Sequence, residues 1–446
     1  MVLIAARQQT TVDPIAQDGR PGSPGVLRAR PCMIRVTRLE TLSSRGRPSP
    51  FAALRARNYC LYWFGLVLYV LGHRAEYVTF AWIVWEVTGD PLALGYLGLA
   101  QGVPLVVFQL FGGVLADRTN RLRLLIVTQA LTAVTLTLTF ALAVSGFARL
   151  GPLLALAALS NTFRAFDEPS RLSLVPALID RERLPNAIAL GSIPWQAGRM
   201  IGPSVTGIAI ATFGGSVGLA IAALASYGAL ALYGRLRIGD AVPLKGRGHV
   251  GTEFAEGLRF VARHFVFASL IGLALFNSLF GMSYVTLLPI YADRYFHAGS
   301  TGYGLLNAAH GVGSLVGTLT LATAAHRIAR PGRTLLIVAT CLGLELVAFA
   351  LAPGMPMALA TLVLVGFSST FYLTLVSTYM QQNVPDRLRG RVLSIYALCW
   401  NVMPLGGMLA GALSAAVDAR FALAVGGALV SANALLLLAS RRLRGL

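Results

Sequence analysis

Long apolar stretches recur along this chain, and they constrain its fold more than any other feature. A helix needs about 20 mostly apolar residues to cross the hydrocarbon core of a bilayer. Stretches of about that length occur in two groups of six: 59–86, 92–116, 122–146, 151–173, 186–211 and 214–236, then 266–292, 301–325, 333–352, 355–381, 390–416 and 420–440. The sequence therefore predicts an all-α membrane protein with twelve transmembrane helices and no separate soluble domain.

The composition supports the membrane class and excludes several functions. Hydrophobic residues make up 56% of the chain and charged residues 12%, against roughly 25% charged residues in soluble domains. The four cysteines form neither a C-x-x-C metal pattern nor a disulfide framework. No phosphate-binding G-x-x-x-x-G-K-[ST] pattern and no H-E-x-x-H pattern is present. We therefore expect no metal, no cofactor, no ATP drive and no enzyme activity.

The basic residues indicate the orientation of the chain in the membrane. The net charge of +19 could suggest nucleic-acid binding. If both termini are cytoplasmic, however, the inner loops and the C-terminal tail hold 21 Arg and Lys residues, Arg171 among them. The outer loops then hold only Arg149, Arg294 and Arg420. Since cytoplasmic loops carry the excess of Lys and Arg, the pattern predicts a multi-pass inner-membrane protein with cytoplasmic termini and no nucleic-acid partner.

The two groups of apolar stretches resemble each other in sequence. The tetrapeptide LLIV occurs at 124–127 and again at 335–338, which is 211 residues later. A Val-Pro pair occurs at 175–176 and again at 384–385, which is 209 residues later. This spacing predicts a duplicated unit, with an N-terminal six-helix bundle over 51–236 and a C-terminal one over 266–440. A duplicated bundle with a pathway between its halves is a transporter architecture.

Three further segments complete the predicted domain organisation. Residues 1–50 are rich in Arg, Pro, Ser and Gly, and we expect a disordered basic tail; translation could start at Met1 or at Met33. Residues 237–265 are predicted to be a cytoplasmic linker with an amphipathic helix, capped by Thr252. In that helix Phe254, Leu258 and Val261 would share one face along the membrane surface. Residues 441–446 form a basic C-terminal tail.

The loop between the second and third stretches resembles the signature of a known superfamily. Its sequence GGVLADRTNR contains Gly113, Asp117, Arg118 and Arg121, and the spacing is similar to that of the major facilitator superfamily. That superfamily usually has Gly where this chain has Asn120. Further stretches resemble the branch of transmembrane secretion effectors, which includes enterobactin-type siderophore exporters. These stretches are 167–190, 198–207, 252–265, 287–296 and 384–398. The resemblance covers roughly 51–440 and implies two six-helix bundles that work by alternating access.

The resemblance implies that this charged loop is part of a cytoplasmic gate. Asp117 would face the N-terminus of a helix of the other half near Arg389 and Arg391. Arg118 or Arg121 would pair with an acid at the end of the fourth stretch. The acids Asp167 and Glu168 are placed for this role. The alternative is simple positive-inside topology, which accounts for the Arg residues but not for Asp117.

Glycines at a spacing of four or five residues occur in the fifth stretch. The segment GRMIGPSVTG contains Gly198, Gly202, Pro203 and Gly207, and it is similar to the motif associated with antiporters of the superfamily. Small residues at this spacing let helices approach closely. Helix packing alone would also explain the pattern, but the resemblance favours export.

Charged residues within the stretches are candidates for proton coupling. Such charges are costly in a membrane and should face a cavity or a partner. His73, Arg74 and Glu76 lie in the first stretch, and Arg164 lies in the fourth, on a face shared with Asp167 and Glu168. Our hypothesis is that Glu76 exchanges the coupling proton, tuned by His73, Arg74 or Arg164. The alternative is a static ion pair that orients helices. Glu345 is isolated in its stretch, where it would be neutral or buried against a neighbour.

Other polar and aromatic residues within the stretches are candidates for the wall of a substrate cavity. They are Tyr69, Tyr77, Asn161, Arg199, Asn277, Asn307, His310, Trp400 and Asn401. Lone polar residues in such helices also often bond to a neighbouring helix.

The predicted function is secondary active transport. We expect proton-coupled efflux of a small amphipathic, siderophore-like or drug-like molecule, by a monomer in the lipid bilayer. One alternative is an uptake or lipid-flipping transporter on the same fold, which the direction of flux would distinguish. Another is a non-transporting membrane receptor or assembly factor, which would show no flux and no dependence on Glu76.

Overall fold

The computed structural model describes residues 51–237, 250–324, 328 and 330–444, apart from the side chains of some residues within helices. The predicted tail over 1–50 lies outside the described residues. In the described part of the N-terminal half, the long helices are α1 (Arg57–Thr88), α2 (Pro91–Arg118), α3 (Arg121–Val144), α4 (Leu150–Leu178), α5 (Leu184–Phe213) and α6 (Val217–Tyr233). The short 3-10 turns η1 (Ala52–Arg55) and η2 (Arg181–Arg183) precede α1 and α5.

The C-terminal half follows the same plan with more interruptions. A helix α7 (Val250–Arg263) lies in the predicted linker. The next segment consists of α8 (Phe265–Phe276), the π-helical turn η3 (Asn277–Gly281), α9 (Tyr284–Ile290) and the π-helical turn η4 (Tyr291–Tyr295). The remaining helices are α10 (Gly299–Ala324), α11 (Pro331–Ala350), α12 (Met355–Asn383), α13 (Asp386–Asn401), α14 (Met403–Ala416), α15 (Ala419–Leu438) and the short α16 (Arg441–Arg444).

Each predicted stretch corresponds to one long helical segment, if α8 to η4 and α13 with α14 are each taken as one segment, whereas α7 and α16 lie outside the stretches. By length and composition alone, seven helices of the described residues could cross a membrane. Segments outside that set include α1 and α4, which carry several charged residues, and α6, which has 17 residues. Charge lowers the hydropathy of α1 and α4, and the contacts of those charges are described below.

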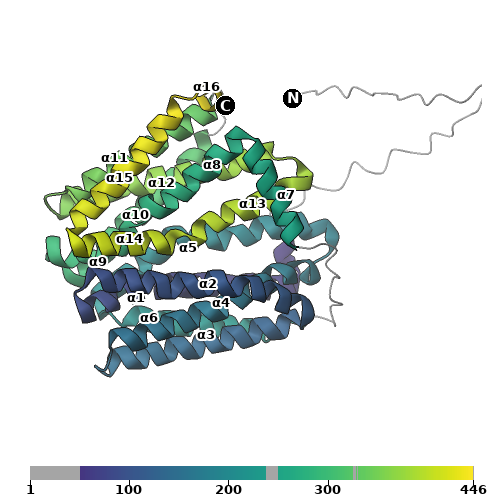
Figure 1. Ribbon diagram of the computed structural model, residues 1–446. Coiled ribbons are helices and arrows are strands. Elements are labelled where there is room, and N and C mark those ends of the chain that lie inside the picture. Colours follow the sequence, from purple (N-terminus) through teal and green to yellow (C-terminus); the bar gives the residue numbers. More distant parts are fainter. Residues whose placement is uncertain (1–50, 238–249, 325–327, 329, 445–446) are drawn as a thin grey trace, which may run out of the picture. The chain divides into compact units, whose positions relative to one another are not determined.

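The contact pattern within one half recurs in the other (Figure 1). In the N-terminal half α2 packs on α4, and α3 packs on α4 and α6. At the equivalent places in the C-terminal half, α10 packs on α12, and α11 packs on α12 and α15. Between the halves α5 packs on α10, and α14 packs on α2. Each of these two contacts joins the fifth segment of one half to the second segment of the other.

Two hydrogen bonds and a ring contact between the halves lie towards the turn between α1 and α2, which we call the α1–α2 end. Trp85 Nε1 donates a hydrogen bond to Asp293 Oδ2 at 3.0 Å, and Tyr303 OH donates to the Val78 carbonyl oxygen at 2.9 Å. Trp82 and Tyr303 stack with ring centroids 5.5 Å apart. The opposite end, where α2 turns into α3, is called the α2–α3 end.

The linker helix α7 differs from its predicted placement in two respects. It begins at Val250, so Thr252 is not its cap. Leu258 is exposed, whereas Val261 is buried with Leu388, Val392 and other residues of α13 and its surroundings. The side chain of Phe254 lies outside the described residues. The helix therefore packs on α13, because Val261 faces the protein and Leu258 does not.

Candidate functional site

Arg164 on α4 joins two residues of one turn of α1. Its guanidinium forms an ion pair with Glu76 and a hydrogen bond with His73 Nδ1. Ser160, one turn before Arg164 on α4, donates to the other oxygen of Glu76 at 2.7 Å. Glu76 is 1% exposed and Arg164 6%. Both oxygens of this buried carboxylate therefore have a partner, and α4 holds α1 through charge as well as packing.

The contact with Arg164 determines the protonation of His73. A guanidinium can only donate hydrogen bonds, so the ring nitrogen that faces it must accept. His73 Nδ1 is that acceptor, and the imidazole is therefore neutral, with its proton on Nε2. A proton added to Nδ1, or to the Glu76 carboxylate, would remove a contact of Arg164.

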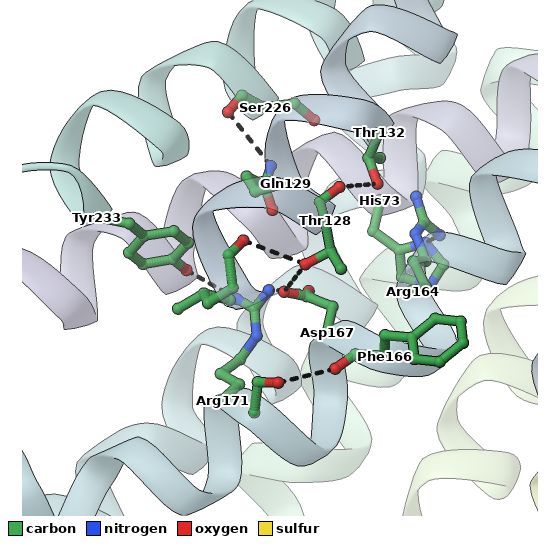
Figure 2. Close-up of polar contacts among 12 residues, drawn as sticks. His73, Thr128, Gln129, Thr132, Arg164, Phe166, Asp167, Arg171, Ser226 and Tyr233 are labelled. Carbon is green, nitrogen blue, oxygen red and sulfur yellow. Dashed lines mark hydrogen bonds and ion pairs between the residues drawn. The ribbon is translucent and has the colours of Figure 1, made fainter. Parts of the chain in front are cut away.

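A second buried ion pair lies farther along α4 (Figure 2). Arg171 pairs with Asp167 one turn earlier on the same helix, and it donates to Tyr233 OH at 2.7 Å. Thr128 on α3 contacts the other oxygen of Asp167 at 3.5 Å. Asp167 is 2% exposed and Arg171 3%. The second pair therefore connects α4 to α3 and α6 inside the N-terminal half.

Tyr69 lies between the two ion pairs. Its ring is stacked on His73 with centroids 6.3 Å apart, and the Arg171 guanidinium carbon lies 3.5 Å from its centroid. Trp195 on α5 contacts the same ring edge-on at 5.9 Å. An aromatic ring under a guanidinium is a stabilising cation–π arrangement. The two ion pairs and Tyr69 thus form one network across α1, α4, α5 and α6.

The structure corrects the placement of Arg171. We counted this residue among the cytoplasmic loop arginines, but α4 continues to Leu178, beyond the predicted end at 173, and Arg171 is buried within it. The spacing of four between Asp167 and Arg171 is the sequence signal that could have indicated the pair. Ser160 could have been found in the same way, four residues before Arg164. The contributions of Thr128 and Tyr233 depend on packing between helices and leave no local signal.

The predicted gate residues lie at or near the α2–α3 end. Gly113, Asp117 and Arg118 belong to the last turns of α2, and their side chains lie outside the described residues. Asn120, which replaces the usual Gly, caps α3: its side-chain oxygen accepts from the backbone N–H groups of Leu122 and Arg123, both at 3.1 Å. Arg121 donates to the Ser173 carbonyl oxygen on α4 at 3.3 Å.

The other gate candidates have partners of their own. Asp167 is in the buried pair with Arg171. Glu168 is exposed and accepts a hydrogen bond from Gln109 on α2 at 3.3 Å. Arg391 on α13 forms an ion pair with Glu256 of the linker helix α7. Arg389, near the start of α13, is half-buried.

The glycines of α5 lie where neighbouring helices approach most closely. A Cβ atom at Gly198 would overlap Val70, and one at Gly202 would lie 2.6 Å from Arg74 Cβ, both on α1. A Cβ atom at Gly207 would lie 2.6 Å from Gly304 Cα on α10, in the other half. Pro203 lies inside the same helix. The glycines therefore serve close packing, two of them within the N-terminal half and one between the halves.

The cavity candidates fall into different environments. Asn161 and Asn307 are buried, and each donates to a carbonyl oxygen one turn earlier on its own helix, at 2.9 and 2.8 Å. Asn277 is buried at the start of η3, against Gly281. Arg199 and Asn401 have side chains outside the described residues.

The aromatic candidates lie in different places: His310 lies beside Tyr284, and Trp400 lies on α13. Tyr77 on α1 is half-buried. The Tyr284 and His310 rings lie 5.8 Å apart. Trp400 is half-buried beside Tyr396, with ring centroids 6.5 Å apart.

Comparison with known proteins establishes the family. A family model described as transmembrane secretion effector matches residues 48–445. The chain belongs to this family of transporters. Its resemblance to the major facilitator superfamily and to this branch is thereby confirmed, and it is not an enzyme.

Curated relatives of the chain are transporters at moderate identity. The multidrug efflux pump Tap of Mycolicibacterium fortuitum is 28% identical over 77% of this chain and 86% of the relative. The staphyloferrin A transporter of Staphylococcus aureus is 25% identical over the same shares. The enterobactin exporter EntS of Citrobacter koseri is 28% identical over 81% of this chain and 84% of the relative.

Solved structures of transporters share the fold. The peptide transporter POT in complex with sulfate has a TM-score of 0.65 at 13% identity, covering 87% of this chain and 95% of its own. The nucleoside transporter NupG has a TM-score of 0.64 at 12% identity, covering 86% of this chain and 98% of its own. The predicted all-α membrane fold is therefore confirmed.

Proposed function

We propose that this secondary transporter exports a small amphipathic molecule in exchange for protons, and that Glu76 takes up the coupling proton. The observation that carries the proposal is the pair of contacts that Arg164 makes with Glu76 and His73. Arg164 and Glu76 form a buried ion pair between two helices, and a single proton on Glu76 can break it.

The charge balance of the pair makes it sensitive to protonation. With Glu76 ionised, the Arg164 charge is compensated. When a proton neutralises Glu76, a buried guanidinium keeps only the neutral His73 and loses its counter-ion. Removing one partner of a buried ion pair costs about 3–5 kcal/mol, and each 1.4 kcal/mol changes a conformational equilibrium about tenfold. Protonation therefore supplies enough free energy to shift the transporter between two states.

The proton signal has a path to the contacts between the halves. α1 carries Glu76, and two residues later its Val78 carbonyl accepts the hydrogen bond from Tyr303 of the C-terminal half. The same helix packs through Val70 and Arg74 on the glycines of α5, which in turn contacts α10 at Gly304. A change in the contact between α4 and α1 thus acts on α1 and α5, two of the helices that contact the C-terminal half.

The orientation follows from the basic loops. With cytoplasmic termini, the α1–α2 end is the outer end, and the contacts between the halves close the outside. This conformation is then inward-facing, with Glu76 deprotonated, as expected after a proton has been released to the cytoplasm and before substrate is carried out. The contacts of Arg121, Glu168 and Arg391 at the α2–α3 end, together with Asp117, Arg118 and Arg389, are the candidates for closing that end in the opposite state.

Direction and substrate class are supported by the relatives. Their names include a multidrug efflux pump and an enterobactin exporter. The aromatic residues Tyr77, Tyr284 and Tyr303, with His310 beside them, suit a molecule with both apolar and polar parts. We propose a monomer in the cell inner membrane with a siderophore-like or drug-like substrate.

The test uses purified protein in liposomes with a pH-sensitive dye inside and ethidium as the probe. Under an imposed proton gradient, we expect ethidium-dependent proton movement by the wild type and at least a tenfold loss in Glu76→Gln. The matched control is Glu86→Gln, which makes the same change at an exposed position of the same helix and should behave like the wild type. Proton movement that survives in Glu76→Gln would refute the assignment of the proton to Glu76.

A further inference from the structure

Glu345 is a second carboxyl group within a membrane-length helix, and its surroundings differ from those of Glu76. It lies on α11, and Ser368 on α12 donates a hydrogen bond to its Oε1 at 2.8 Å. Its Oε2 is buried and has no hydrogen-bond partner among the described residues. Glu76, in contrast, has partners for both oxygens.

The elements packed on α11 bring no cation to Glu345. α12 and η3 contain no charged residue, and the only one in α15 is Arg420, in its first turn. Arg420 stacks on Tyr295 instead. Within α11 the nearest cation is Arg333, twelve residues away, or about 18 Å along a helix. The arginines of α16 lie just after the C-terminal end of α15, where Leu443 packs near the start of α11.

Apart from arginine, the ionisable side chains of α11 and α12 other than Glu345 are Cys341, Tyr372 and Tyr379. Tyr291 of η4 stacks on Phe349 of α11. An ionised carboxylate with one hydroxyl donor and no cation is costly within a membrane. A group in such a position takes up a proton instead of remaining charged.

We propose that Glu345 carries a proton in this conformation and is a second proton-binding site of the transporter. This inference rests on the proposed function for its role in transport, but not for the protonation itself. The Ser368 hydroxyl donates to the carbonyl oxygen of the acid, and the proton resides on Oε2. Loss of the proton leaves the charge with Ser368 as its only described donor.

A path leads from Glu345 to the helix that joins the halves. Two residues before Ser368, Gly366 lies directly against the His310 carbonyl of α10, and its own carbonyl oxygen accepts from Ser314 of α10 at 3.3 Å. α10 carries the candidate site residue His310 and meets α5 at Gly304. A movement of α12 at Ser368 is therefore transmitted to α10 by direct packing, since Gly366 leaves no side chain between the helices.

Infrared spectroscopy of the full chain in lipid nanodiscs tests the protonation without a substrate. At neutral pH we expect a carboxyl C=O band typical of a protonated acid in apolar surroundings. The band should disappear in Glu345→Gln, persist in Glu76→Gln and shift in frequency in Ser368→Ala. An unchanged band in Glu345→Gln, or no such band in the wild type, would overturn the proposal. Neither result depends on proton-coupled transport, so failure of the proposed function is seen separately.

The link to α10 has its own readout. Spin labels at Thr119→Cys and Gln382→Cys, both exposed at the α2–α3 end of different halves, report the separation of the halves. We expect Glu345→Gln to remove part of the pH dependence of this distance. Leu344→Gln, which places the same side chain at the neighbouring exposed position, should leave the pH dependence unchanged. Equal pH dependence in wild type and Glu345→Gln would reduce Glu345 to a buried hydrogen bond without a role in transport.

Discussion

At the scale of single residues, the N-terminal half is built around charges that compensate one another. Glu76 and Asp167 are matched by Arg164 and Arg171, and all four side chains are buried. The two pairs differ in what they connect. The ion pair of Arg164 joins α4 to α1, so it depends on the relative position of the two helices. Arg171 and Asp167 belong to one helix and move together. We therefore propose that the first pair senses protons and that the second contributes to stability.

The Asp167–Arg171 pair makes a testable contribution to stability. Arg171→Met leaves Asp167 buried without its cation and also removes the contact with Tyr69, so we expect a loss of about 3–5 kcal/mol. The double variant Asp167→Asn with Arg171→Met should recover much of this loss, since no charge remains uncompensated. Thermal unfolding of the purified variants in detergent measures the order of stability. A double variant less stable than Arg171→Met would contradict the role assigned to the pair.

The sequence predicts the charged residues of this site but not all of their partners. Spacing places Arg164 on one face of α4 with Asp167 and Glu168, yet its ion pair is with Glu76 of α1. Spacing along one helix reports neighbours on that helix only. Whether Arg164 pairs with an acid of α1 or of α4 depends on which face of α4 turns towards α1. Asp167 is already paired with Arg171. For the same reason Tyr233 and Thr128 could not be assigned from local pattern.

At the scale of elements, α5 connects the proton site to the other half. Its first two motif glycines let it contact α1, and Gly207 lets its backbone approach α10 at Gly304. The backbones of Gly207 and Gly304 meet directly, so there is no side chain that could rotate away to make room for an added Cβ atom.

An added methyl group at this crossing should weaken closure of the α1–α2 end. In Gly207→Ala the new Cβ would lie 2.6 Å from Gly304 Cα, and overpacking of this kind costs about 1–3 kcal/mol. The cysteine pair Gly95→Cys with Met408→Cys, at another close contact of the halves, reports closure by its cross-linking yield once the native cysteines are replaced. We expect Gly207→Ala to slow cross-linking about fivefold or more. Gly272→Ala, with no atom near the added carbon, is the control; equal slowing in both would refute the argument.

Element boundaries follow from the apolar runs to different degrees. Each of the twelve runs corresponds to a helical segment, because a membrane requires long apolar helices with satisfied backbones. The runs miss the last turn of α4, residues 174–178, and the π-helical turns η3 and η4, whose backbone irregularity has no signal in hydropathy. The predicted placement of Val261 of α7 along the membrane surface is wrong, because Val261 packs on α13.

At the scale of the whole molecule, the two halves have the same helix arrangement but different buried charged groups. Equivalent helices make equivalent contacts, as the repeated LLIV and Val-Pro segments suggested. The N-terminal half holds two compensated ion pairs, whereas α11 of the C-terminal half carries the carboxyl of Glu345 beside Ser368. The hydrogen bonds described between the halves lie towards the α1–α2 end. A proton that acts on α1 or α12 therefore acts next to the joints between the halves.

The central claim is that protonation of Glu76 releases this conformation, and a distance measurement tests it most directly. Pulsed electron spin resonance between labels at Thr119 and Gln382 follows the α2–α3 end in lipid nanodiscs, with no substrate required. We predict that acidification increases the population with a short distance, and that Glu76→Gln shows this population already at neutral pH, while Glu86→Gln follows the wild type. A distance distribution that is the same at all pH values, and the same in Glu76→Gln as in the wild type, would contradict the account.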